Sequence, residues 1–198
     1  NSPDTTYSLR TDQDERQKEL GHNFRFGSDF YFTPNDVLKI SGVYNTENED
    51  NHTDIEFFNY SETRIHPDDM VSRERRDELE EEDEGDYELN MNYEKTFGEE
   101  DHQLTADFQA RKSIEVEDAH LVETAGLPNA SKDTSLFQNS LNDTEVEAFM
   151  GKLDYTWPFS EDGKFETGFR GEVREIVNVY NVEQRPSASE SWNTLDRF

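Results

Sequence analysis

The chain has 198 residues, of which only 31% are hydrophobic, and 47 acidic residues outnumber 19 basic ones, giving a formal net charge of −28. Such an acidic surface repels nucleic-acid phosphates, so we expect no nucleic acid as a partner. The apolar residues are too few for an ordinary globular interior, and no run of 18 apolar residues predicts a transmembrane helix. The absence of cysteine excludes disulfides and thiolate metal sites.

Apolar and polar residues alternate in six stretches, which predicts six β-strands joined as three hairpins. In the first hairpin, residues 22–33 and 37–47, Phe24 lies on one side of its strand and Arg25 on the other. A Pro-Asn-Asp sequence separates the two strands, as a tight reversal requires.

The second hairpin covers residues 86–97 and 103–117, and the third covers residues 146–159 and 165–182. Both repeat the alternation and have short polar turns, the last one with Asp-Gly. Pro158 has no amide hydrogen, so we expect it at a strand end or a bulge. A tilted strand needs about 9 to 11 residues to cross a bilayer, and each of the six is long enough.

Long polar connections follow each hairpin, at about residues 48–85, 118–145 and 183–198. Outer-membrane barrels show this asymmetry, with short periplasmic turns and long external loops. We therefore predict an all-β, antiparallel, up-and-down transmembrane barrel segment. The smallest common barrels have eight strands, so we expect residues 1–198 to be a partial outer-membrane barrel, continued by strands elsewhere in a longer protein. The alternative is a soluble antiparallel sandwich.

In a closed barrel the polar parity of each strand faces the lumen and the apolar parity faces lipid. Opposite charges on neighbouring strands can also pair across the wall without recognising a solute. The lumen-facing candidates are Arg25, Asp29, Lys39, Glu88, Glu94, Asp107, Arg111, Lys152, Asp154, Glu166, Arg170, Glu172 and Arg174. The lipid-facing candidates are Phe24, Phe26, Phe30, Leu89, Met91, Phe108, Leu153, Tyr155, Trp157 and Phe169.

Aromatic residues also gather near the strand ends. Tyr44 and Tyr87 lie near the long connections, and a larger aromatic group lies near the short turns: Phe30, Phe32, Phe97, Trp157 and Phe159. Transmembrane barrels carry aromatic girdles at both membrane interfaces. We expect the residues near the short turns in the periplasmic girdle and the two tyrosines in the outer one.

No catalytic pattern is present, so we expect no enzyme. The five histidines are scattered, and no nucleophile elbow, phosphate loop or dinucleotide fingerprint occurs. Residues 68–69 and 77–86 supply many carboxylates, but they lack the ordered spacing and turn glycine of an EF-hand. We expect no metal site and no cofactor.

The hairpins resemble part of the barrel of TonB-dependent receptors, in the outer membrane beta-barrel branch found in Bacteroidota. The resemblance covers most of residues 20–182 and rests on three signatures. These are NFRFGSDFYF at 23–32 with its Pro-Asn-Asp turn, LNMNYEKTF at 89–97 leading to LTAD at 104–107, and KLDY at 152–155 followed by FETGFRG at 165–171.

This resemblance implies a cell outer membrane location and a nutrient import pore for a siderophore, glycan or peptide. In that family a plug fills a barrel of about 22 strands and couples to an energy-transducing inner-membrane complex. Partners implied are therefore outer-membrane lipid, that complex and a transported solute. Two alternatives stay open: a plugless barrel with a structural or secretion role, and a soluble acidic extracellular β-sandwich that binds a partner.

Overall fold

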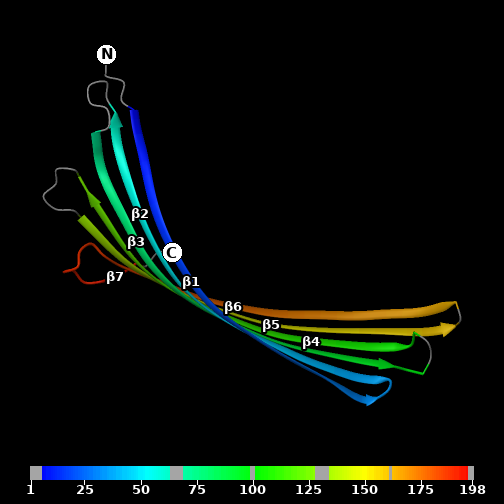
Figure 1. Ribbon diagram of the computed structural model, residues 1–198. Coiled ribbons are helices and arrows are strands. Elements are labelled where there is room, and N and C mark those ends of the chain that lie inside the picture. Colours follow the sequence, from blue (N-terminus) through cyan, green and yellow to red (C-terminus); the bar gives the residue numbers. More distant parts are fainter. Residues whose placement is uncertain (1–5, 63–68, 99–100, 128–133, 161, 196–198) are drawn as a thin grey trace.

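The described part of the chain folds as a single antiparallel sheet with its strands in chain order. The computed structural model describes residues 6–62, 69–98, 101–127, 134–160 and 162–195. The six long strands run side by side along one curved, twisted sheet, with three short turns at the same end (Figure 1). The strands are β1 (Thr6–Thr33), β2 (Asp36–Glu62), β3 (Asp69–Thr96), β4 (Gln103–Gly126), β5 (Thr134–Ser160), β6 (Gly163–Arg185) and the two-residue β7 (Asn193–Thr194).

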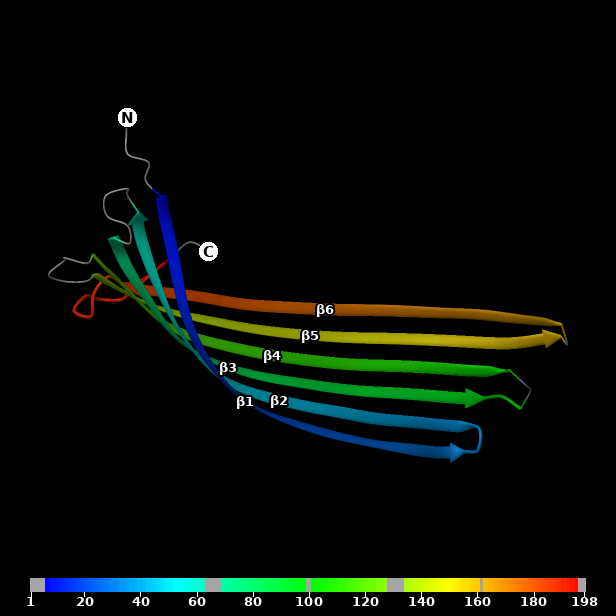
Figure 2. The same ribbon diagram turned by 45° about the horizontal axis from the view of Figure 1, so that its top comes forward.

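This arrangement confirms the predicted all-β, antiparallel, up-and-down architecture. A sandwich would require a second sheet over the apolar face, and the described residues form only one sheet (Figure 2). Among these residues, no helix is long and apolar enough to cross a membrane. Only Ala119 and Val182 count as buried apolar residues in the described sheet, so it has no interior core of its own.

The prediction that residues 48–85 and 118–145 are long external loops is wrong. β2 continues to residue 62, and β3 already begins at residue 69. Residues 118–126 and 134–145 belong to β4 and β5, and β1 begins at Thr6 rather than near residue 22. Each strand is therefore far longer than a membrane requires, since 28 extended residues span roughly 90 Å.

The extra strand length is held by polar contacts, which a search for apolar alternation does not detect. Arg75 Nε donates to Asp54 Oδ1 at 3.1 Å across the β2–β3 pair, and Asn59 Nδ2 donates to Ser72 Oγ at 2.9 Å. Backbone ladder bonds need no apolar face, so charged segments pair wherever their side chains find partners. We name the part of the sheet beyond the apolar residues the polar extension: residues 6–22, 46–62, 69–85, 113–126, 134–145 and 177–185.

Residues paired across the ladder form rows that cross the sheet and share one face. Three successive rows on one face contain no charged residue, and we call this region the apolar belt. Its rows are Phe30-Leu38-Tyr93-Ala106-Leu153-Phe169, Ser28-Ile40-Met91-Phe108-Gly151-Gly171 and Phe26-Gly42-Leu89-Ala110-Phe149-Val173.

Many side chains of the belt are exposed on the sheet, and others, such as Leu38 and Leu89, are half-buried. Phe169 is 72% exposed and Phe26 is 55% exposed, although both lie among apolar neighbours. A contiguous apolar surface of this kind marks an interaction with another apolar phase or partner.

Within the belt, the ring of Phe26 covers Gly42 on the neighbouring strand. A Cβ built on Gly42 would lie 2.3 Å from Phe26 Cε1, whereas a Cβ on Gly151 would meet nothing within 4 Å. The absence of a side chain at Gly42 therefore allows the aromatic ring to lie flat across the strand pair.

We expect Gly42→Ala to destabilise the folded sheet by about 1 kcal/mol, because the Phe26 ring must move aside for the added methyl group. The matched control is Gly151→Ala, which adds the same methyl group in open space on the same face. The measurement is the free energy of unfolding in denaturant. Equal effects of the two substitutions would show that Phe26 does not pack on Gly42.

Candidate functional site

All thirteen predicted lumen-facing residues lie on one face of the sheet, and all ten predicted lipid-facing residues lie on the other. The ladder joins Arg25, Val43, Glu88, Arg111, Ala148 and Arg174 in one row, and Asp29, Lys39, Asn92, Asp107, Lys152 and Arg170 in another. We call this the polar face. The ladder thus brings together residues from six strands, and the assignment of this face to a lumen stays a prediction.

Aromatic pairs mark both ends of the apolar belt. Tyr44 and Tyr87 stack at a ring distance of 4.9 Å in the row next to the belt, on the side of the polar extension. Trp157 and Phe159 meet edge to face at 6.4 Å beside a short turn. These pairs lie where the two aromatic girdles were predicted.

Several polar-face charges pair with one another. Lys39 Nζ donates to Glu94 at 3.0 Å across β2 and β3, and Arg111 donates to Asp86 at 3.2 Å across β3 and β4. Lys152 pairs with Asp154 along β5 itself. These contacts stabilise the wall, which is the structural role that opposite charges on adjacent strands were expected to have.

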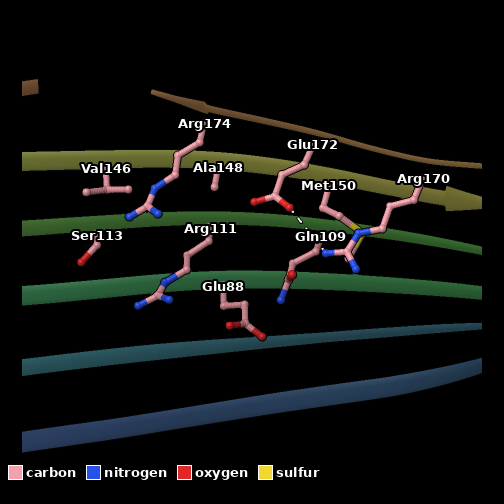
Figure 3. Close-up of a pocket in the computed structure, with 10 residues that line it drawn as sticks. All are labelled: Glu88, Gln109, Arg111, Ser113, Val146, Ala148, Met150, Arg170, Glu172 and Arg174. Atoms are coloured by element: carbon pink, nitrogen blue, oxygen red, sulfur yellow. Dashed lines mark hydrogen bonds and ion pairs between the residues drawn. The ribbon is translucent and has the colours of Figure 1, made fainter. Parts of the chain in front are cut away.

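Five of the thirteen candidates line a common cavity of about 320 Å³ on the polar face: Glu88, Arg111, Arg170, Glu172 and Arg174. They come from β3, β4 and β6, and Figure 3 shows their side chains spread over the strands from β3 to β6. The cavity is lined by charged side chains. Its row containing Glu88 and Arg111 lies next to the row of the Tyr44–Tyr87 pair. It is the strongest concentration of predicted site residues in the described sheet.

The polar extension carries a second cluster, which was not predicted because Glu49, Glu82 and Glu84 were expected in a long loop rather than in paired strands. One row places four glutamates on four successive strands: Glu19, Glu49, Glu82 and Glu117. The next row adds Glu47, Glu84 and Glu115. Like charges directly opposite one another destabilise a sheet, so this arrangement costs folding free energy.

Two groups within this cluster have the geometry to hold a hard cation. The carboxylate oxygens of Glu19, Glu47 and Glu49 lie within 4.8 Å of one another, and so do those of Glu82, Glu84 and Glu115. Calcium and magnesium take oxygen ligands of this type. The sequence does not signal such a group, because each one combines two glutamates of one strand with a third from the neighbouring strand.

Burial raises the pKa of Glu82 to about 7, and a side-chain hydrogen bond with Glu84 contributes to the rise. The negative charges of Glu84, Glu115 and Glu49 act in the same direction. The pKa of Glu47 is also raised, first by Glu19 and then by burial. These residues lie beyond the apolar belt, so water and protons reach them.

We expect the stability of the sheet to fall as the pH rises from about 4.5 to about 7. The unfolded chain releases the Glu82 proton at lower pH than the folded chain, so rising pH favours unfolding in this window. Glu82→Gln should remove part of this fall, and the measurement is the denaturation midpoint at a series of pH values. Glu190→Gln, which removes a carboxyl group outside the six long strands, is the control. Parallel pH profiles of Glu82→Gln and the parent would contradict the raised pKa.

Comparison with known proteins agrees with this geometry. Residues 95–198 match the outer membrane protein beta-barrel family, which covers β4, β5, β6, β7 and the turn before them. A search of curated proteins found no match. The matched residues include the two strand pairs around the polar cavity and half of the apolar belt. This chain is a β-barrel wall of the outer membrane and belongs to the outer membrane protein beta-barrel family.

Proposed function

We propose that this barrel wall belongs to a TonB-dependent receptor that imports a nutrient such as a siderophore, a glycan or a peptide. The apolar belt then faces lipid, and the polar face lines a lumen filled by a plug. Energy comes from an inner-membrane complex that pulls on the plug. The protein acts as a transporter and catalyses no covalent reaction.

The observation that carries this proposal is the division of charge between the two faces at the level of the belt. The three belt rows contain no charged side chain. Between them on the polar face, a single row holds Asp29, Lys39, Asp107, Lys152 and Arg170. Charges at membrane depth are tolerated where they line water or another part of the protein. A plug packed against many such charges satisfies this requirement.

The polar extension supports the same proposal. It continues the wall well past the Tyr44–Tyr87 pair, with polar side chains such as Asp50 and Glu49 on opposite faces. Such a rim presents a large hydrated surface to the outside, where an importer must first capture its solute. Long external segments perform this role in outer-membrane barrels generally.

The proposal predicts that the pore of the full-length native protein conducts almost no ions. When it is reconstituted into a planar lipid bilayer, we expect almost no steady ion current, because a plug blocks the lumen. Urea should open the pore reversibly. The plug is not embedded in lipid as the closed barrel is, so we expect it to unfold at a lower urea concentration than the barrel. The measurement is single-channel conductance before, during and after urea.

A plugless barrel gives a different record. It would conduct from the moment of insertion, and urea below the barrel's own unfolding range would not change the current. That outcome would contradict the receptor proposal and favour a structural or secretion role. Heat-modifiable migration on gels provides the control that the barrel is folded in every sample.

A further inference from the structure

The cavity on the polar face has an unusual floor. Along β5 the polar-face positions Val146, Ala148 and Met150 are all apolar, and the row of Ala148 carries arginine on both neighbouring strands. Arg111 on β4 and Arg174 on β6 form the walls of this trough. The alternation that places polar residues on this face is therefore interrupted along this part of β5, and the apolar side chain of Ala148 lies between two arginines.

The two arginines lie opposite each other. Arg111 and Arg174 both pair with Ala148 across the ladder, so their backbones are separated by two strand spacings, or roughly 10 Å. Figure 3 shows both side chains extending in the same direction along the sheet, toward Ser113 and Val146. The small side chain of Ala148 leaves the space between them open. A single anionic group seated there is within reach of both guanidinium groups.

The hydrogen-bonding capacity of these arginines is only partly used. Arg111 donates to Asp86 at 3.2 Å, and its side chain is 56% exposed. Within the described parts of the chain, no hydrogen bond or ion pair involves Arg174. A guanidinium group carries five N–H donors in a planar fork that matches a carboxylate or a phosphate. Free donors therefore converge on the trough from both walls.

The trough is much less acidic than the chain as a whole, so an anion is repelled less there than elsewhere on the wall. Three arginines line the cavity with two glutamates, and one of these glutamates, Glu172, already accepts from Arg170 at 3.5 Å. Glu88 lies on β3, beyond Arg111 as viewed from β5. Asp86 on the same face pairs with Arg111, so three arginines and three carboxylates balance here, in a chain whose formal charge is −28.

We propose that this trough binds an organic anion. Its carboxylate or phosphate group lies between Arg111 and Arg174, and its apolar portion rests on Val146, Ala148 and Met150. Arg170 and Gln109 border the inner end of the trough, where they contact polar groups on the same solute. This proposal specifies only the chemical class of the ligand. It does not depend on the import mechanism, because binding at equilibrium needs neither a plug nor an energy source.

The test uses the full-length native protein in lipid nanodiscs and three small probes: benzoate, its neutral analogue benzamide, and inorganic phosphate. Binding is measured by saturation-transfer NMR and by calorimetric titration. We expect benzoate to bind and benzamide to bind at least tenfold more weakly, because only the anion forms charge-assisted hydrogen bonds. Inorganic phosphate is an anion without an apolar portion, so it tests whether charge alone is enough for binding. Added salt should weaken benzoate binding, because it screens the charges.

Arg174→Gln and Arg111→Gln should each weaken benzoate binding by about tenfold to a hundredfold, the range expected for the loss of one charged hydrogen-bond donor set. Arg174→Lys keeps the charge but loses the fork, so it should recover only part of the affinity. The control is Arg16→Gln, which makes the same charge change on the opposite face, in the polar extension. Gel migration without heating verifies that each variant is folded.

Two results would overturn the proposal. One is benzoate binding by Arg174→Gln that equals binding by the parent, and the other is an equal loss in Arg16→Gln, which would indicate only a general effect of net charge. An absence of benzoate and phosphate binding to the folded parent would also overturn it. None of these outcomes bears on the conductance record, so the failure of this site and the failure of the import proposal are distinguishable.

Discussion

The continuous backbone ladder is the constraint on which the rest of this sheet depends. Each long strand pairs with its neighbour over nearly its full length, and the register shifts only near strand ends, at Tyr31/Thr33, Asn59/Tyr60 and Pro158/Ser160. Because side chains alternate with a period of two, a slip of one residue on any strand would exchange its faces. Such a slip on β4 would place Asp107 in the apolar belt and Phe108 on the polar face.

This ladder gives the wall two parts with different chemistry. The apolar belt near the short turns has one face without charge, as a lipid environment requires, since backbone groups there must be satisfied within the sheet. The polar extension beyond it has charged side chains on both faces and is held by contacts such as Arg75 with Asp54. The row from Glu19 to Glu117 lowers stability, so it is not explained by folding alone.

The arginine trough lies where these two parts meet. Its position follows from the ladder, which aligns Arg111 and Arg174 on either side of Ala148. A solute entering from the polar extension would therefore first meet a strongly acidic surface and then the two arginines of the trough. If the proposed site is correct, the overall charge of the wall repels most anions, and the trough binds those that reach it. The proposed import function and the proposed anion site thus describe successive stages along one face.

The sequence was sufficient to predict the strand type, the pairing order and the division of the thirteen and ten residues between two faces, because apolar alternation records that division directly. It failed for the polar extension, where Glu47 and Asp83 occupy opposite faces but look alike in composition. Pro158 was correctly placed at a bulge, since its missing amide hydrogen is a local property. The trough was not predictable, because the adjacency of Arg111, Ala148 and Arg174 depends on the register of three strands.

The central claim is that the belt face meets lipid and the opposite face meets an aqueous or protein-filled lumen. Site-directed spin labels in the reconstituted native protein test this most directly. Labels would be placed at Leu89 and Phe108 on the belt and at Asn90 and Asp107 on the polar face. The account predicts that collisions with oxygen, which concentrates in lipid, dominate at the first pair, and that they are weak at the second. Equal accessibility at adjacent residues, or the reverse pattern, would contradict it.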